Sequence, residues 1–475
     1  MENQLIGRKR EQEILKQCLD SGKAEFIAVT GRRRVGKTYL VKKFFNENFD
    51  FYITGVFNGT KREQLDVFSR AINAYSGIYY PRVFNWFDAF EQLKGYLSSL
   101  RKDRIVVFID ELPWLDSSRS RFLQAFELFW NSWASTCNSL KLVVCGSATT
   151  WMVSRLFGNR GGLHNRTTRR IHLQPFSLAE VEDYLSMRGI EMSRYQMVET
   201  YMIFGGIPYY LSLLTKGFSL PQNVDRLCFA RGGEMRDEYQ LLMRSLFNES
   251  AAYQQVVEFL ATKAKGFTRA DLLAETRLDG GFLTEVLRNL EMCDFIRKYY
   301  PFAKKERDAV YQLVDLFSLF HLRYVKHAGN RDEHLWSNLS PTPAHNAWCG
   351  YAFEQVCLHH VPQIKETLGI AGVQSNVCSW VGDGAQIDLL IDRADQVVNV
   401  CEMKYARQEF EITKAYAEQL RQKMMVLRQT TRTRKALHLT MVTTYGVKRN
   451  IHSSEVQREV TMNDLFRKNY LTGYF

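Results

Sequence analysis

Eight consecutive residues near the start of the chain have the types and order of a phosphate-binding loop. They read Gly-Arg-Arg-Arg-Val-Gly-Lys-Thr and lie between an apolar segment, 24–30, and the helix-like run TYLVKKFF. Glycines let the backbone N–H groups face phosphate oxygens, and the helix N-terminus adds partial positive charge. The loop comprises Gly31, Arg32, Arg33, Arg34, Val35, Gly36, Lys37 and Thr38. We predict that Lys37 binds the β- and γ-phosphates and that Thr38 ligates Mg²⁺, with a chance Gly-Lys turn as the alternative.

A second segment, RIVVFIDE at 104–111, combines a strand with two carboxylates. Its β-branched apolar run is typical of a buried parallel strand, and α/β sheets bind ligands at the carboxyl ends of such strands. There Asp110 would hold Mg²⁺ through water, while Glu111 would orient and deprotonate the attacking water. The alternative is a helix N-cap after the strand.

Polar residues that follow a third strand, KLVVCG at 141–146, add two further candidates. Ser147 could sense the γ-phosphate or cap a helix that begins near Thr149. Between residues 155 and 170 the chain carries five arginines and no acid; they are Arg155, Arg160, Arg166, Arg169 and Arg170. One of them could act as an arginine finger, in cis or from a neighbouring subunit, and a solvated basic face is the alternative.

The C-terminal part of the chain has its own set of charged residues. Asp388 lies in the strand-like QIDLLI, and Glu402 and Lys404 lie in VVNVCEMK, so a hairpin would make the two segments neighbours. Two carboxylates that hold Mg²⁺ beside a lysine suit metal-dependent phosphodiester cleavage. Glu354, in the preceding helix, would join this set. A surface salt bridge is the alternative.

Between these two sets the sequence predicts mostly helices. Ser177 and Glu180 form a capping-box pattern, and residues 176–245 are expected to form a helical lid. Residues 246–330 read as three helices and a hairpin, which is a winged helix. The predicted wing is basic through Lys304, Lys305 and Arg307, so contact with DNA and a structural or protein-contact role both stay open.

Several motifs occur in the order found in the archaeal-type ATPase family, a branch of the P-loop ATPases related to AAA+ and STAND proteins. They are IGRKREQEIL, GRRRVGKT, FIDELPWL, CGSA, LHNRTTRRIHLQPFS and FGGIPY, within residues 1–325. The resemblance implies an ASCE-type core, in which an extra strand separates the loop strand from the Asp110 strand. It also implies ATP and Mg²⁺ as cofactors, Ser147 as a sensor and Arg166 as the arginine after the fourth strand.

Residues 340–450 resemble the PD-(D/E)xK nuclease superfamily, as found in a C-terminal domain of unknown function fused to such ATPases. The carrying segments are GYAFEQVC, QIDLLID and CEMKYA. The resemblance implies a restriction-endonuclease-like core with Glu354, Asp388, Glu402 and Lys404 around a metal. Gln386 departs from the pattern, because related sequences often carry an acid there.

Length, charge and cysteine usage limit the remaining possibilities. The chain has 475 residues, which suggests several domains, and 63 Lys and Arg against 51 Asp and Glu give a net charge of +12. Residues 421–450 contain eight Lys or Arg and no acid, which suits a phosphate backbone or a solvated helix face. Nine cysteines without a CxxC pair and no clustered histidines favour free thiols, a cytoplasmic location and no zinc site. No apolar run is long enough to span a membrane.

We therefore expect an α/β protein with four parts: a P-loop ATPase core (1–175), a helical lid (176–245), a winged helix (246–330) and a nuclease-like domain (340–475). The expected function is ATP hydrolysis coupled to DNA binding or metal-dependent DNA cleavage. The alternative is a nucleotide-gated switch or assembly ATPase whose C-terminal domain is catalytically silent. An arginine finger supplied in trans would require a homo-oligomer.

Overall fold

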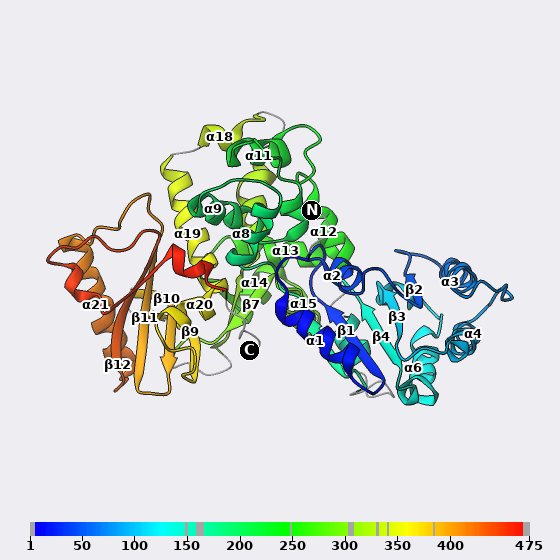
Figure 1. The fold of residues 1–475 in the computed structure, drawn as a ribbon. Coiled ribbons are helices and arrows are strands. Elements are labelled where there is room, and N and C mark those ends of the chain that lie inside the picture. Colours follow the sequence, from blue (N-terminus) through cyan, green and yellow to red (C-terminus); the bar gives the residue numbers. More distant parts are fainter. Residues whose placement is uncertain are drawn as a thin grey trace. The chain divides into compact units, whose positions relative to one another are not determined.

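The computed structural model describes most of the chain and divides it into two compact units. Described are residues 5–147, 151–157, 166–247, 249–302, 308–328, 332–339, 342–382 and 385–468. Unit 1 is Met1–Gln174 and unit 2 is Pro175–Phe475 (Figure 1). Arg160, the helix predicted near Thr149 and the basic wing residues 304, 305 and 307 lie outside the described residues.

Unit 1 contains a parallel five-stranded sheet in the order β2-β3-β4-β1-β5. Its strands are β1 (Glu25–Thr30), β2 (Phe51–Thr54), β3 (Ile105–Asp110), β4 (Leu140–Cys145) and β5 (Arg169–His172). Every residue of β1, β3 and β4 is buried, as continuous apolar runs in a parallel sheet require. Strand β4 lies between β1 and β3, which is the extra strand that the family resemblance implies.

Helices cover this sheet and supply much of its core. They are α1 (Lys9–Asp20), α2 (Lys37–Phe44), α3 (Lys61–Ser76), α4 (Trp86–Ser99), α5 (Leu112–Leu115) and α6 (Phe122–Ser132), with short turns η1 (Ala134–Thr136) and η2 (Met152–Phe157). Aromatic rings from α4 and α6 pack together: Trp86 lies edge-on to Phe122, and Phe126 lies edge-on to Phe26 of β1. This core fixes the strands whose ends carry the candidate site.

The first part of unit 2 is helical. It contains α8 (Leu178–Met187), α9 (Arg194–Phe204), α10 (Pro208–Ser212), α11 (Leu220–Val224), η3 (Asp225–Phe229) and α12 (Glu238–Leu246). The predicted capping box is present, because Ser177 accepts from the Glu180 N–H while the Glu180 carboxylate accepts from the Ser177 N–H. Helix α9 ends at Gly205 with φ of 65°, and a Cβ on Gly206 would collide with the Phe176 carbonyl. Both glycines are therefore demanded by the backbone here.

Three helices and a three-stranded sheet follow. They are α13 (Ser250–Ala261), α14 (Arg269–Thr276) and α15 (Gly280–Met292), with β6 (Phe267–Thr268), β7 (Ile296–Tyr299) and β8 (Val310–Leu313) in the order β6-β8-β7. Val286, Leu287 and Leu290 of α15 are buried, as the helical periodicity predicts. These elements match the predicted sequence of helices and hairpin, and the winged-helix identification stays a prediction.

The last part of unit 2 is built on a mixed sheet. Helices α16 (Leu316–Phe320), α17 (Lys326–Ala328) and α18 (Leu335–Leu339), with η5 (His321–Val325), lead to α19 (Pro343–His359) and α20 (Val361–Thr367). The sheet has the order β13-β12-β11-β10-β9. Its elements are β9 (Ser375–Gly382), β10 (Ala385–Arg393), β11 (Val397–Lys404), α21 (Lys414–Thr431), β12 (Ala436–Thr443), η6 (Ser453–Glu455), β13 (Arg458–Thr461) and η7 (Met462–Phe466).

The predicted hairpin is present, with β10 and β11 antiparallel, while β12 and β13 run parallel to β11. Val426 and Leu427 of α21 pack with Trp380, Ile387 and Leu390 of β9 and β10, which holds the helix against the sheet. This makes a separate α/β sheet domain within unit 2, and its nuclease fold stays a prediction.

All nine cysteines are free thiols. Seven are buried, and only Cys137 of unit 1 and Cys378 of unit 2 are partly exposed. Over the described part of the chain, no helix is both long and apolar enough to cross a membrane.

Candidate functional site

The backbone of the loop between β1 and α2 depends on its two glycines. Gly31 has φ of 137°, and a Cβ there would collide with the Leu173 carbonyl oxygen. Gly36 has φ of 93° and directly precedes the first turn of α2. Only glycine adopts these angles cheaply. The sequence therefore curls the loop over the N-terminus of α2, as an anion site needs.

The Lys37 side chain is buried within this loop. Its Nζ donates to the carbonyl oxygens of Gly31 at 3.0 Å and Arg32 at 2.9 Å. A bound phosphate would offer charged acceptors in exchange for these neutral ones. The buried Arg8 adds a contact from outside the loop, because its Nη2 donates to the Val35 carbonyl at 3.3 Å. The spacing of charges did not predict this role for Arg8.

The ends of β3 and α2 meet at Asp110 and Thr38. The Thr38 hydroxyl donates to Asp110 Oδ2 at 2.9 Å, and the Glu111 N–H donates to Oδ1 at 3.0 Å. Burial, reinforced by the neighbouring Glu111 charge, raises the pKa of Asp110 above its ordinary value, while the Thr38 hydrogen bond acts in the opposite direction. Two hard oxygen donors in a buried, negatively charged position fit a divalent cation such as Mg²⁺.

Glu111 lies beside Ser147, which follows β4. Glu111 Oε2 accepts the Ser147 hydroxyl at 2.8 Å and the Ser147 N–H at 3.1 Å. The backbone of Glu111 is in the left-handed conformation, with φ of 46°. Glu111 is the N-cap residue of α5, but its side chain makes no capping hydrogen bond. Its carboxylate thus contacts the neighbouring strand end rather than capping its own helix. The strand order β3-β4-β1 makes this contact possible.

Four of the five arginines between residues 155 and 170 lie within the described residues. Arg166 is exposed, and Arg155 contributes positive charge near Asp116. The Arg170 guanidinium lies over the Phe157 ring, 4.1 Å from its centroid. Within unit 1, the described residues bring Lys37, Thr38, Asp110, Glu111 and Ser147 together.

The second predicted set gathers around Glu354 of α19. Asp388 on β10 and Glu402 on β11 each lie one step beyond the paired residues Leu389 and Cys401, and Lys404 lies two residues further along β11. Burial, then the Asp388 charge, raises the pKa of Glu354 to about 8; Glu402 adds to this rise, while Lys404 and Lys423 oppose it. All of these side chains are thus within electrostatic reach of Glu354, and their role as a metal site stays a prediction.

Two residues of α21 join this set without having been assigned to it from the sequence. Lys423 Nζ donates to Glu402 Oε1 at 2.6 Å, and the Tyr416 hydroxyl donates to Oε2 at 3.2 Å. Lys404 instead lies over the Tyr416 ring, 5.3 Å from its centroid. Tyr416 and Lys423 are seven residues apart, which places them on one helix face. This seven-residue spacing is the feature of the sequence that could have placed both residues in the set.

A small pocket, with a volume of about 10 Å³, adjoins Glu354 and Asp388. Gln386 lines it and donates to Asp388 Oδ1. The opposite wall comes from the β6–β8 region and includes Arg297, whose Nε donates to Gln312 Oε1 at 2.7 Å, and Lys265. Desolvation lowers the pKa of Arg297. Acidic and basic groups therefore face one small cavity, a contact between predicted domains that the sequence did not indicate.

The basic stretch 421–450 is largely neutralised by neighbouring acids. Five of its Lys and Arg form ion pairs: Arg421 with Glu418 and Glu455, Lys423 with Glu402, Lys435 with Asp392, Lys448 with Glu411, and Arg449 with Glu459. Fewer charges are therefore directed at solvent than the count suggests. This favours the solvated-face alternative for most of the stretch.

Residues 5–214 match a family described as an ATPase domain predominantly from Archaea. This match supports ATP binding and hydrolysis by that part of the chain. The chain is also 24% identical, over 89% of its length and 92% of the relative's, to the uncharacterised protein MJECL04 of Methanocaldococcus jannaschii. A shorter match, 51% identical over 39 residues, covers 8% of this chain and 66% of the uncharacterised ATP-binding protein MJ0423 of the same organism.

Two solved structures were also found to be similar. The Walker-type ATPase of Pyrococcus abyssi is 18% identical, with a TM-score of 0.49, and the match covers 67% of this chain and 96% of that one. The ORC2 protein of Aeropyrum pernix is 13% identical, with a TM-score of 0.42. That match covers 69% of this chain and 96% of the ORC2 chain.

Proposed function

We propose that this chain, whose residues 5–214 match an ATPase domain family found predominantly in Archaea, binds ATP in the loop 31–38 and hydrolyses it. The observation that carries the proposal is the hydrogen bond between Thr38 and Asp110, which joins the loop to the end of β3. It places an ammonium, a hydroxyl and two carboxylates at one sheet edge, where α/β folds bind ligands.

Each residue has a distinct role in this proposal. The loop N–H groups and Lys37 bind the phosphates, and Glu111 accepts a proton from the attacking water. Ser147 orients Glu111 through the two hydrogen bonds described above. Thr38 and Asp110 would hold Mg²⁺, which when bound neutralises charge on the phosphate oxygens. Arg166 is proposed as the finger arginine, supplied in cis or by another copy of the chain.

The test compares ATP binding and phosphate release by the full chain and by Lys37→Ala. We expect the variant to lose tight binding and turnover, because the phosphates lose their buried ammonium. Lys16→Ala, on the exposed side of α1, is the matched control and should behave as wild type. Unchanged binding and turnover in Lys37→Ala would exclude the proposed site.

A second candidate function is metal-dependent cleavage of DNA by Glu354, Asp388, Glu402 and Lys404. The pocket supports it, because Arg297 and Lys265 supply positive charge opposite the two acids and phosphate is the anion that arginine recognises well. Glu354 and Asp388 offer oxygen donors to Mg²⁺, which when bound activates water. ATP hydrolysis in unit 1 would drive or regulate this activity.

Plasmid and single-stranded DNA, incubated with Mg²⁺ or Mn²⁺ and with or without ATP, test this second function. Asp388→Asn should abolish cleavage, whereas Asp395→Asn, in the adjacent exposed turn, should not. Cleavage that survives Asp388→Asn would exclude the site. ATP-dependent binding of DNA or protein without any cleavage would instead favour a nucleotide-gated switch or assembly ATPase.

A further inference from the structure

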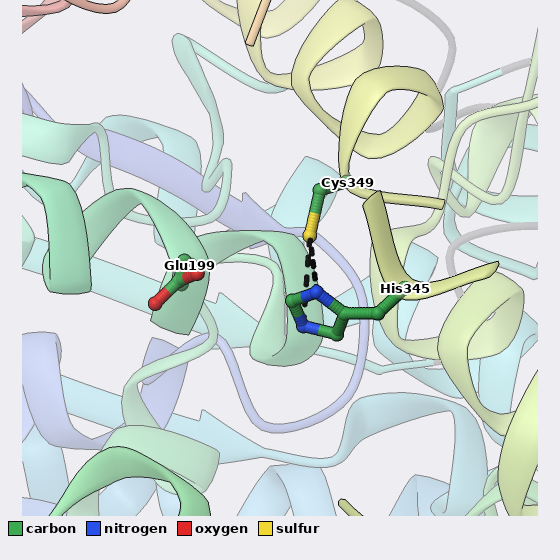
Figure 2. A group of neighbouring side chains, drawn as sticks. All are labelled: Glu199, His345 and Cys349. Carbon is green, nitrogen blue, oxygen red and sulfur yellow. Dashed lines mark hydrogen bonds between the residues drawn. The ribbon is translucent and has the colours of Figure 1, made fainter. Parts of the chain in front are cut away.

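Outside both candidate sites, unit 2 brings three side chains together. Two of them lie on successive turns of one helix, and the third comes from a helix that is distant in the sequence. Glu199 comes from α9, and His345 and Cys349 come from α19, which packs against α9 (Figure 2). His345 and Cys349 are buried, and Glu199 is partly buried. One ligand atom from each residue lies within 4.8 Å of the others.

We propose that Glu199, His345 and Cys349 form a zinc site that ties α9 to α19. The site is separate from the proposed ATP and nuclease sites and does not depend on either function. Its donor set, one carboxylate, one imidazole and one thiol, is typical of Zn²⁺. A fourth position is left for water or a further ligand.

The donors lie close together, although the sulfur faces the ring rather than the lone pair of one nitrogen. Cys349 Sγ lies 3.7 Å from both ring nitrogens of His345, and Figure 2 shows the sulfur directed at the ring. Zn–S and Zn–N distances of about 2.3 and 2.0 Å at a tetrahedral angle place sulfur and nitrogen about 3.6 Å apart. The separation has the required length, and a turn of the imidazole about its Cβ–Cγ bond would direct one nitrogen at an ion shared with the sulfur.

Local structure explains why these two donors converge. His345 and Cys349 are four residues apart on α19, and side chains at that spacing lie on one face of a helix. The Trp336 ring packs 5.0 Å from the His345 ring, centroid to centroid, and restricts its orientation. Apolar packing of this kind around ligands keeps a site ordered.

Nearby charge defines the alternative explanation. Arg407 is within electrostatic reach of Glu199, His345 and Cys349, and it could serve as the counterion of Glu199 without any metal. A zinc site contains a bond between the metal and the Cys349 thiolate, whereas a metal-free cluster neutralised by Arg407 does not. Detecting that bond therefore distinguishes the two explanations.

Cobalt(II) substitution measures that bond. The full-length protein is treated with chelator, dialysed and titrated with Co²⁺, and absorbance is recorded in the near-ultraviolet and visible regions. We expect a thiolate-to-cobalt charge-transfer band that saturates at an equimolar amount of metal and disappears when Zn²⁺ is added. Cobalt bound only by oxygen ligands, as at a Mg²⁺ site, gives no such band.

Variants assign the band to this cluster. Cys349→Ser should remove it, His345→Asn should weaken cobalt binding, and Cys228→Ser, a buried cysteine elsewhere in unit 2, should leave the titration unchanged. Circular dichroism checks that each variant is folded. Absence of the band in the wild-type protein, or its persistence in folded Cys349→Ser, would overturn the proposal.

Discussion

The Glu111→Gln substitution gives the sharpest test of the proposed ATPase mechanism. Glutamine has nearly the same shape, and its amide oxygen can still accept both hydrogen bonds from Ser147. The site geometry should therefore survive, while the basic oxygen is lost. Because a positioned general base contributes about 10²- to 10⁴-fold, we expect turnover to fall by that factor, or about 3–5 kcal/mol in the barrier.

The assay measures phosphate release and ATP binding separately. Binding should be unchanged in Glu111→Gln, because Lys37 and the loop N–H groups are intact. Ser147→Ala is the comparison: it removes the hydroxyl bond but leaves the backbone N–H bond to Glu111. Its loss should lie between about 10-fold and about 160-fold, since one hydrogen bond to a charged group is worth about 1.5–3 kcal/mol. Wild-type turnover in Glu111→Gln would refute the assignment of Glu111 as the base.

Three further predictions concern stability. Lys423→Met should lower the free energy of unfolding of unit 2 by about 3 kcal/mol in urea denaturation, because it leaves Glu402, 7% exposed, without its ion-pair partner; an unchanged midpoint would contradict this. Burial raises the pKa of Glu354 to about 8, so the folded metal-free state binds more protons than the unfolded state between about pH 4.5 and 8. Stability should therefore fall as pH rises through that window, and Glu354→Gln should flatten the pH profile of the unfolding midpoint. Gly31→Ala should cost about 2–3 kcal/mol and weaken ATP binding, measured by thermal unfolding and titration, because φ of 137° and the Leu173 carbonyl both oppose a Cβ.

Local patterns in the sequence predicted much of this structure. Strands β3 and β4 are mostly apolar runs, and α15 is one of the three helices predicted between residues 246 and 330. The hairpin that aligns Asp388 with Glu402 follows from alternation and a turn between them. These elements are determined by neighbours in the chain, so a single sequence contains the necessary information.

Contacts between distant elements were not predictable in the same way. The bond from Lys423 to Glu402 depends on how α21 crosses the sheet, and the place of Arg297 in the pocket depends on how β7 lies against α19 and β10. The sequence also gave no reason to expect zinc, because Glu199 is about 150 residues from His345. Most ion-pair partners of the basic residues in 421–450 also come from other elements, so the count of charges did not show how many are paired.

The distribution of thiols provides separate reporters for the two units. Each unit has a single partly exposed cysteine, Cys137 in unit 1 and Cys378 in unit 2, while the other seven are buried. A thiol-reactive probe would label buried positions only when the surrounding structure opens. Mass spectrometry of labelled peptides with and without nucleotide would then time the opening of each unit from the native protein, without any engineered label.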